Sequence, residues 1–390
     1  MKHTILTATL AALTATASLT GCRTDDDLVM PTPQDTHQQM QTQYLGMYVL
    51  CEGNMGSNKA TLDYLDLHTG QYLKNIFPSR NPQQVKELGD VGNDCQIYGS
   101  RLWLVVNSSN KVEVCTADSA FSLGHVDVPN CRYLAFHGGH AYVSSYVGPV
   151  GGTSVQGSVY KIDTLTLRVV GRTAVGYQPE EMAIVDSLLY VANSGGYSAM
   201  QGQGYDRTVS VISLNSFTEV GRIDVAPNLF RLRADRHGQL WVTSRGDYGA
   251  HPSRLYLLSK GPDGLMAKRD SFDLPVTDLA FRGDSLLYMA SSYDADWNQT
   301  TTFGLIDTRT HQLLNANIIP ATTQIETAYG LMVHPVTGHL YVMDATNYVS
   351  SGWLCCFSPS GQLLWRVSTG DIPGHACWLT RNTLITNHLK

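Results

Sequence analysis

The sequence has 390 residues, of which 43% are hydrophobic and 15% are charged, and its formal net charge is −6. This apolar fraction excludes a wholly disordered chain, and no apolar run reaches the about 18 residues that a membrane-spanning helix needs. Nucleic acid is also disfavoured as a partner, because Asp and Glu outnumber Lys and Arg and nucleic-acid-binding faces are basic. The 35 glycines and 15 prolines indicate many turns.

The chain begins with a segment that resembles a bacterial lipoprotein signal peptide. Lys2 precedes an apolar stretch of small residues, and Leu19-Thr20-Gly21-Cys22 resembles a lipobox. We therefore expect residues 1–21 to be removed and the Cys22 thiol to be acylated. Several acyl chains on one residue hold a protein stably on a membrane. An ordinary cleaved signal, in which Cys22 is incidental, is the alternative.

Residues 22–43 are predicted to form a lipidated, flexible tether. Pro31 and Pro33 stand there among many Gln and Thr residues, a composition typical of linkers. The acidic run at 25–27 resembles the surface-export signal of Bacteroidetes lipoproteins. We expect a protein that is anchored in the outer membrane and faces the cell exterior.

The remaining cysteines do not form a disulfide framework. Seven of the eight cysteines follow Cys22, which is an odd number, and all seven lie in or beside strand-like runs. No Cys-x-x-Cys pair occurs, so a structural zinc site is not expected. Most of these side chains are predicted to be small buried hydrophobes.

Seven similar strings recur from residue 48 onward. Each has an aromatic residue followed by apolar or small residues, at Tyr48, Trp103, Tyr142, Tyr190, Trp241, Tyr288 and Tyr341. Tyr48 and Tyr341 are 293 residues apart over six intervals, so the repeat is about 49 residues long, the size of a four-stranded propeller blade. The sequence therefore predicts an all-β, seven-bladed β-propeller over residues 44–390.

The two ends of this domain complement each other. The first repeat starts with a second-strand motif, at Tyr48, and no first strand precedes it. Residues 376–379 resemble a first strand that has no blade of its own. We expect the N- and C-terminal strands to pair in one blade, because pairing removes the free edge of an open ring. Residues 383–386 have no predicted partner. Five tryptophans in strand runs are expected in the core: Trp103, Trp241, Trp353, Trp365 and Trp378.

Several motifs resemble known surface propellers. Residues 189–194, 208–213 and 219–223 resemble the YVTN/YncE-like repeats. Residues 52–54, 60–64, 88–90 and 104–107, with 370–374 and Cys377-Trp378, resemble the Bacteroidetes lipoproteins of the BtuG family. This resemblance covers roughly residues 44–379. It implies a protein that captures cobalamin at the cell surface and passes it to a BtuB-like TonB-dependent outer-membrane transporter.

The loops that are predicted on one face of the ring are long and rich in tyrosine. Tyrosine and tryptophan offer a large flat contact area with a polar edge, which suits a corrin ring. The residues expected to contact the ligand are Tyr146, Tyr177, Tyr197, Tyr205, Tyr248, Tyr293, Trp297, Tyr329 and Tyr348.

The sequence is also compatible with functions other than cobalamin capture. The same face would also suit a glycan or a protein. No complete enzyme motif occurs, and no catalytic residue is predicted. A metal-dependent lactonase is the enzyme alternative, because Glu180, Glu181, Asp278 and Glu326 start blades and would converge at the central channel. A Ca²⁺ ion held there by oxygen ligands is a further possibility.

Overall fold

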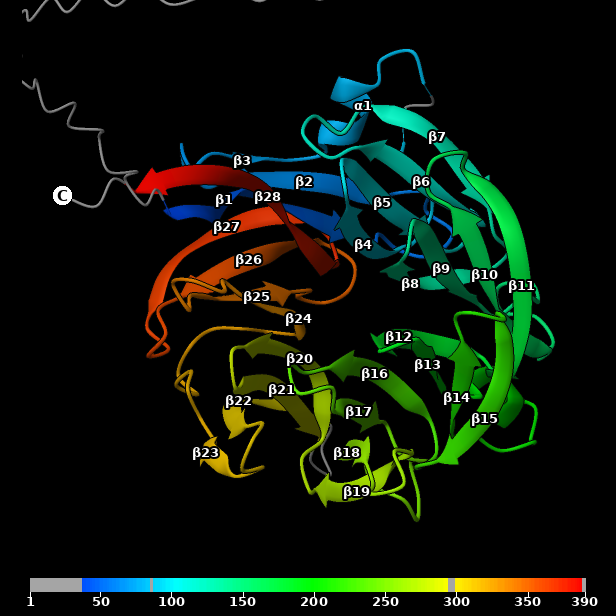
Figure 1. Cartoon of the computed structure of the whole chain (residues 1–390). Helices are drawn as coiled ribbons and strands as arrows, with labels where there is room; N and C mark the ends of the chain where they lie inside the picture. The colour runs from blue at the N-terminus through cyan, green and yellow to red at the C-terminus, as the bar shows by residue number, and fades with distance from the viewer. Residues whose placement is uncertain (1–36, 85–86, 294–298, 388–390) are drawn as a thin grey trace, which may run out of the picture. The chain divides into compact units, whose positions relative to one another are not determined.

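The computed structural model describes residues 37–84, 87–293 and 299–387. Within them lie seven four-stranded antiparallel sheets, which are arranged around a central channel (Figure 1). This confirms the predicted seven-bladed β-propeller. The blades belong to a compact unit, Thr42–Arg381, and the terminal residues form a second unit. No helix in the described part of the chain is long and apolar enough to span a membrane.

Each sheet is one blade, and its first strand lies nearest the channel. The strands of each blade, from the channel outward, are β28 (Pro373–Asn387), β1 (His37–Cys51), β2 (Thr61–Asp66) and β3 (Tyr72–Leu73) in blade 1; β4 (Gly92–Tyr98), β5 (Arg101–Val106), β6 (Lys111–Thr116) and β7 (Ser122–Asp127) in blade 2; β8 (Cys131–His137), β9 (His140–Ser145), β10 (Gln156–Asp163) and β11 (Arg168–Tyr177) in blade 3; β12 (Pro179–Val185), β13 (Leu188–Asn193), β14 (Thr208–Ser213) and β15 (Thr218–Asp224) in blade 4; β16 (Leu229–Ala234), β17 (Leu240–Ser244), β18 (Arg254–Lys260) and β19 (Met266–Phe272) in blade 5; β20 (Val276–Arg282), β21 (Ser285–Tyr293), β22 (Gln299–Asp307) and β23 (Leu313–Asn315) in blade 6; and β24 (Ala328–Val333), β25 (Leu340–Asp344), β26 (Ser351–Phe357) and β27 (Leu363–Asp371) in blade 7. Two short helices, α1 (Ile76–Arg80) and α2 (Gly196–Met200), lie in connections between described strands.

The second strand of each blade is the repeated aromatic string. In β17 and β25 every residue is buried, because both faces of these strands are covered by neighbouring blades. Such strands are mostly apolar along their length instead of alternating between apolar and polar residues. Trp103 and Trp241 are fully buried there, as predicted.

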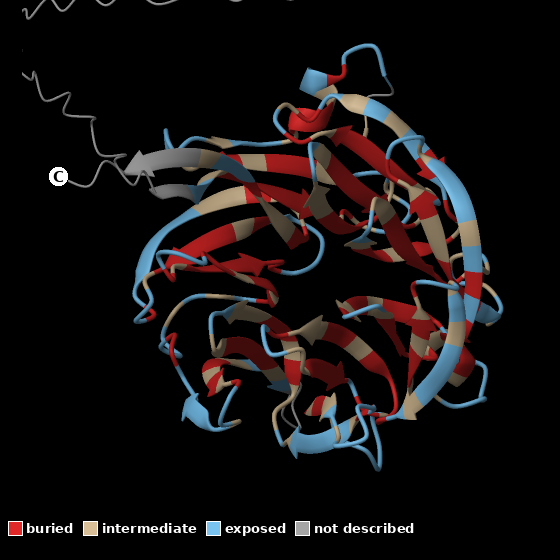
Figure 2. Cartoon of the chain, viewed as in Figure 1, coloured by how far each residue is buried: buried red, intermediate tan, exposed pale blue. Residues whose placement is uncertain are grey.

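The fourth strands form the outer rim of the propeller and are largely exposed, as the pale ribbon of β15 and β19 shows (Figure 2). Trp365 lies on the fourth strand β27 and is 37% exposed. The prediction that Trp365 belongs to the core is therefore wrong. A strand run alone does not reveal whether the strand is an inner or an outer one.

The ring is closed as the sequence predicts. β28, from the C-terminal end, is the innermost strand of blade 1 and lies beside β1. β1 already begins at His37, within the predicted tether, whose residues 22–36 lie outside the described residues. In the terminal unit, the Thr383 hydroxyl donates a hydrogen bond to the Gln41 carbonyl oxygen at 3.4 Å, so residues 383–386 belong to β28.

The core consists of apolar clusters between neighbouring blades. The described residues contain seven such clusters, one at each blade boundary, including the boundary between blades 7 and 1. Six of the described cysteines are buried in or beside these clusters, and Cys377 is partly exposed. Because every blade packs on two others, the ring is a rigid support for the loops at its edges.

Candidate functional site

The antiparallel topology sends two kinds of loop to one edge of the ring. The chain leaves each second strand at the edge where the first strand of the same blade begins. Loops between second and third strands therefore share this edge with the connections between blades, and we call it the long-loop face. The loops 146–155, 194–207, 245–253 and 345–350 lie on it. The opposite edge has short turns such as 138–139 and 283–284.

Six of the predicted tyrosines form three ring pairs on the long-loop face. Their ring centroids are 5.3, 6.4 and 5.6 Å apart in the pairs Tyr146–Tyr197, Tyr205–Tyr248 and Tyr329–Tyr348. The first two pairs each join loops of neighbouring blades. These edge-to-face and tilted arrangements stabilise the loops against one another.

The members of these pairs differ in exposure. Tyr248 is 79% exposed and Tyr348 is 43% exposed, so both present their rings to solvent. Tyr146 is buried, and its hydroxyl donates a hydrogen bond to Glu180. The Tyr329 hydroxyl likewise donates to Glu52 Oε2 at 3.1 Å. These two hydroxyl groups are engaged by the protein itself.

The structure describes two of the three remaining predicted ligand-contact residues. Tyr177 is 42% exposed, at the end of β11. Only Gln178 separates Tyr177 from β12, which begins at Pro179, so Tyr177 lies in a tight connection between blades and not in a long loop. Tyr293 is the last residue of β21, and Trp297 lies outside the described residues.

The long loops also carry exposed apolar residues that sequence analysis missed. Met200 ends α2 and is 85% exposed, and Met55 and Val349 are similarly exposed in the loops after β1 and β25. Only aromatic residues were considered in the sequence, although methionine is well suited to adaptable binding surfaces. The apolar side chains of this face thus come from blades 1, 4, 5 and 7.

A compact hydrogen-bond cluster shapes the loop that presents Tyr248. Asp247 Oδ2 lies 2.6 Å from His251 Nδ1, and Asp247 Oδ1 accepts hydrogen bonds from the Gly249 and His251 N–H groups. The hydrogen bond from the His251 side chain, with those from the backbone, lowers the pKa of Asp247 to about 2. Tyr248 itself has a left-handed backbone, with φ +56°.

We predict that His251→Ala raises the pKa of Asp247 toward the ordinary value of about 3.9, because the variant loses the strongest hydrogen bond to the carboxylate. Carboxyl ¹³C chemical shifts, followed by NMR through an acid titration, measure this midpoint. His237→Ala, on the short-turn edge, should leave it unchanged. An Asp247 midpoint near 2 in His251→Ala would show that His251 does not organise the loop.

The first strands place a ring of polar side chains in the central channel. At the third residue of six of these strands stand Asp94, Tyr133, Glu181, Arg231, Asp278 and His375. In blades 2 to 7 the register between the first and second strands shifts next to this residue. Such bulges redirect side chains, here toward the channel.

Three carboxylates of this ring connect alternate pairs of blades. Each accepts a hydrogen bond at 2.9 Å from a backbone N–H group on the first strand of the next blade: Asp94 from Leu134, Glu181 from Leu232, and Asp278 from Leu331. Charge-assisted hydrogen bonds of this kind are about twice as strong as neutral ones. The acidic residues that start blades therefore have a structural role at these boundaries.

Arginines neutralise most of the acidic groups in the channel. Arg233 Nε lies 2.9 Å from Glu181 Oε1, and Arg132 Nη2 lies 3.2 Å from Glu180 Oε2. Asp278 faces two guanidinium groups, as described below. Glu326, predicted to converge with these residues, is exposed instead. The described residues contain no group of three His, Cys, Asp or Glu side chains placed to hold a metal ion.

We predict that Asp278→Ala lowers the free energy of unfolding by about 3–5 kcal/mol, because it leaves the buried Arg231 guanidinium without its paired carboxylate. Asp278 Oδ1 lies 3.3 Å from Arg231 Nε and 3.0 Å from Arg233 Nη2, and the Asp278 side chain is 4% exposed. Denaturant unfolding measures the loss. The matched control is Asp224→Ala, whose partner Arg207 lies 2.8 Å away at the surface; it should cost less than about 1 kcal/mol. Equal losses would contradict the role of Asp278.

The same ion pair predicts acid sensitivity. Burial opposes ionisation of Asp278, but the guanidinium groups of Arg231 and Arg233 outweigh it and lower its pKa. The stabilisation is therefore complete above the unfolded-state pKa of about 3.9 and is lost as the pH falls through the lower folded-state pKa. Asp278→Asn should reduce the dependence of unfolding on pH below about 4.

Comparison with known proteins identifies the fold. No protein-family model and no curated protein matches the sequence. Among solved structures, the chain is similar to Kuenenia stuttgartiensis hydrazine synthase, with a TM-score of 0.60 and 14% identity over 77% of this chain and 96% of that one. It is also similar to a quinonprotein alcohol dehydrogenase-like protein from Bacteroides thetaiotaomicron, with a TM-score of 0.58 and 12% identity over 87% and 79%.

A third similar structure is the periplasmic gluconolactonase of Pseudomonas aeruginosa, with a TM-score of 0.55 and 13% identity over 86% of this chain and 99% of that one. At these identities the similarity shows the shared propeller fold alone. One fold hosts many activities, so the ligand must be inferred from the residues of this chain.

Proposed function

We propose that this protein is a surface lipoprotein that captures cobalamin on its long-loop face. It then passes the vitamin to a BtuB-like TonB-dependent outer-membrane transporter. In this proposal the protein acts by binding and carries out no reaction. The ligand and the partner follow from the sequence resemblance to the BtuG family, and the long-loop face supplies the surface for them.

The observation that supports the proposal most is the gathering of exposed tyrosines and methionines on one face. Tyr248, Tyr348 and Met200 are exposed on loops of three different blades. A corrin ring is a broad, partly apolar disc with amide groups at its edge. Flat aromatic and adaptable thioether side chains from several blades suit the disc, because they bury apolar area at little cost in rotamer entropy.

Polar groups on the same loops suit the amide edge of the ligand. Gln201 and Gln203 follow α2 and are exposed, as is Asn347 in the loop before β26. Asn347 Oδ1 accepts hydrogen bonds from the Val349 and Ser350 N–H groups at 3.0 and 2.9 Å, which fixes the backbone of that loop. No partner for the Asn347 amide nitrogen is found in the described part of the chain, so this group can donate to a ligand.

Equilibrium dialysis against cyanocobalamin tests the ligand, with the visible absorbance of the corrin ring as the readout. We expect a higher concentration of cobalamin in the dialysis chamber that contains the protein than in the chamber without it. A panel of oligosaccharides, dialysed in parallel, tests the glycan alternative. Retention of an oligosaccharide and not of cobalamin would replace the proposed ligand. The lactonase alternative is not supported, because Glu180, Glu181 and Asp278 are paired with arginines.

We predict that Cys22→Ala releases the protein from the membrane, because the acyl chains of Cys22 are the proposed anchor. Cys22 lies outside the described residues. Fractionation of cells that express each form measures the change, and circular dichroism checks that the soluble variant is folded. Retention of the variant in washed membranes at high salt would contradict the anchor.

A further inference from the structure

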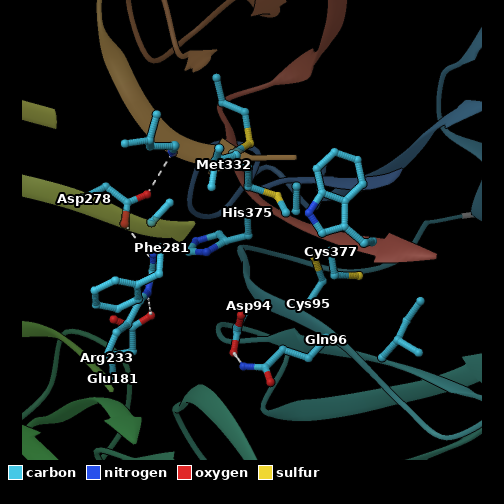
Figure 3. A pocket seen from close by; sticks show the side chains of 18 of the residues that line it. Asp94, Cys95, Gln96, Glu181, Arg233, Asp278, Phe281, Met332, His375 and Cys377 are labelled. Carbon is cyan, nitrogen blue, oxygen red and sulfur yellow. Dashed lines mark hydrogen bonds and ion pairs between the residues drawn. The ribbon is translucent and has the colours of Figure 1, made fainter. Parts of the chain in front are cut away.

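The central channel contains a cavity of about 480 Å³, and four residues of the polar ring, Asp94, Glu181, Asp278 and His375, help to line it (Figure 3). First strands of six blades contribute its lining, which continues to Pro335 in the turn after β24. First strands run from the long-loop face to the short turns, so the cavity extends toward the short-turn edge. Its volume lies within the range of about 300–1,000 Å³ that is typical of small-molecule sites.

The side walls of the cavity are apolar. Phe281, Met332 and Trp378 come from β20, β24 and β28 and are partly exposed where they line it. The Trp378 ring is held by neighbouring rings, with centroids 5.1 Å from His334 and 5.4 Å from Tyr341. These walls would bury the apolar body of a ligand.

The polar end of the cavity holds one carboxylate that no arginine pairs with among the described residues. The Glu181 and Asp278 carboxylates are offset by Arg231 and Arg233, as described above. Asp94 has no such partner: its Oδ2 accepts hydrogen bonds from the Leu134 N–H group and from Gln96 Nε2 at 2.9 and 3.0 Å. No partner for Asp94 Oδ1 is found among residues 37–84, 87–293 and 299–387.

Asp94 is 8% exposed and lines the cavity, so this oxygen is available to a ligand inside it (Figure 3). His375 also lines the cavity, but its Nε2 lies 3.2 Å from Glu52 Oε1 and is directed to that carboxylate. Burial raises the pKa of Asp94 although the nearby His375 opposes the rise, and a bound cation would lower this pKa further. Burying a carboxylate is costly unless a counter-charge accompanies it.

We propose that the channel cavity binds a small primary amine that carries an apolar body. The ammonium group donates a hydrogen bond to Asp94 Oδ1, and the apolar body packs against Phe281, Met332 and Trp378. A carboxylate of the same shape is repelled by Asp94, the carboxylate in the lining that no described arginine offsets. An alcohol of the same shape leaves the Asp94 charge uncompensated. This site is separate from the long-loop face and does not depend on the function proposed for that face.

Titration calorimetry with three probes of similar shape tests the charge preference. The probes are 2-phenylethylamine, 2-phenylethanol and 3-phenylpropionate, at one pH near neutrality. We expect the amine to bind at least tenfold more tightly than the alcohol, and the carboxylate not to bind. Equal affinities for the three probes, or no binding of the amine, would overturn the proposal.

Two variants of the cavity locate the site. Asp94→Asn removes the charge and keeps an oxygen to accept the Leu134 N–H, so it should weaken amine binding at least tenfold. Ala376→Leu adds bulk to the cavity wall on β28 without changing a charge, and it should weaken binding as well. Asp224→Asn, at the surface, is the matched control and should bind the amine as the unmodified protein does.

Amine binding that is unchanged in both cavity variants would place the site elsewhere and overturn the proposal. If Asp94→Asn does not fold, Ala376→Leu and the three-probe comparison decide the question.

Discussion

Deletion of residues 376–390 should abolish cooperative folding of the propeller, or lower its melting temperature by more than about 10 °C. The deletion removes most of β28, the innermost strand of blade 1, and leaves β1 with unpaired backbone groups along the channel. It also removes Leu379 from the cluster between blades 1 and 2, and Trp378 and Ala376 from the cluster between blades 7 and 1. Each large buried side chain that is lost typically costs about 2–5 kcal/mol.

The matched control is deletion of residues 25–36, which stops short of β1. Thermal unfolding, followed by circular dichroism, should show the control melting as the full chain does. Equal melting temperatures for the two deletions would contradict closure of the ring by β28. Folded protein with the 376–390 deletion and an unchanged melting temperature would contradict it as well.

The double change Tyr248→Ala with Tyr348→Ala should weaken cobalamin binding by at least about thirtyfold. Truncation of an aromatic anchor in a binding site commonly costs about 2 kcal/mol or more. Both side chains are exposed in the free protein, so the melting temperature should stay nearly unchanged. The same loss is expected for Tyr293→Ala with Trp297→Ala.

The control for these variants lies at the opposite edge. His237 is in the short turn between β16 and β17, where its Nε2 lies 2.7 Å from Asp284 Oδ1. His237→Ala should not alter cobalamin affinity. If the tyrosine variants bind as the wild type does while His237→Ala binds more weakly, the ligand is held at the short-turn edge and the choice of face is wrong.

The fold was predictable because it is repeated. A second strand that is covered on both faces is mostly apolar, and seven copies of such a string reveal the number of blades. Ring closure was also predictable, since the repeat lacked a first strand at one end and had a spare strand at the other. The exposure of Trp365 was not predictable, because the outer strand β27 begins with apolar residues, Leu363-Leu364-Trp365, as an inner strand would.

The candidate site was predictable in position but not in detail. Topology alone assigned the tyrosines to one face, because loop order follows strand order. The burial of Tyr146 depends on Glu180 and Arg132, which are 34 and 14 residues away from it in sequence, and no local pattern reveals such a contact. The bulges that turn Asp94, Glu181 and Asp278 into the channel are likewise set by pairing with the second strand.

The most direct test of the proposed capture function is titration calorimetry of the wild-type protein with cyanocobalamin. The proposal predicts a saturable heat that fits one ligand per chain, and this heat should be lost or greatly reduced in the Tyr248 and Tyr348 double variant. Absence of any heat with cobalamin at micromolar concentrations would show that cobalamin is not the ligand of this protein.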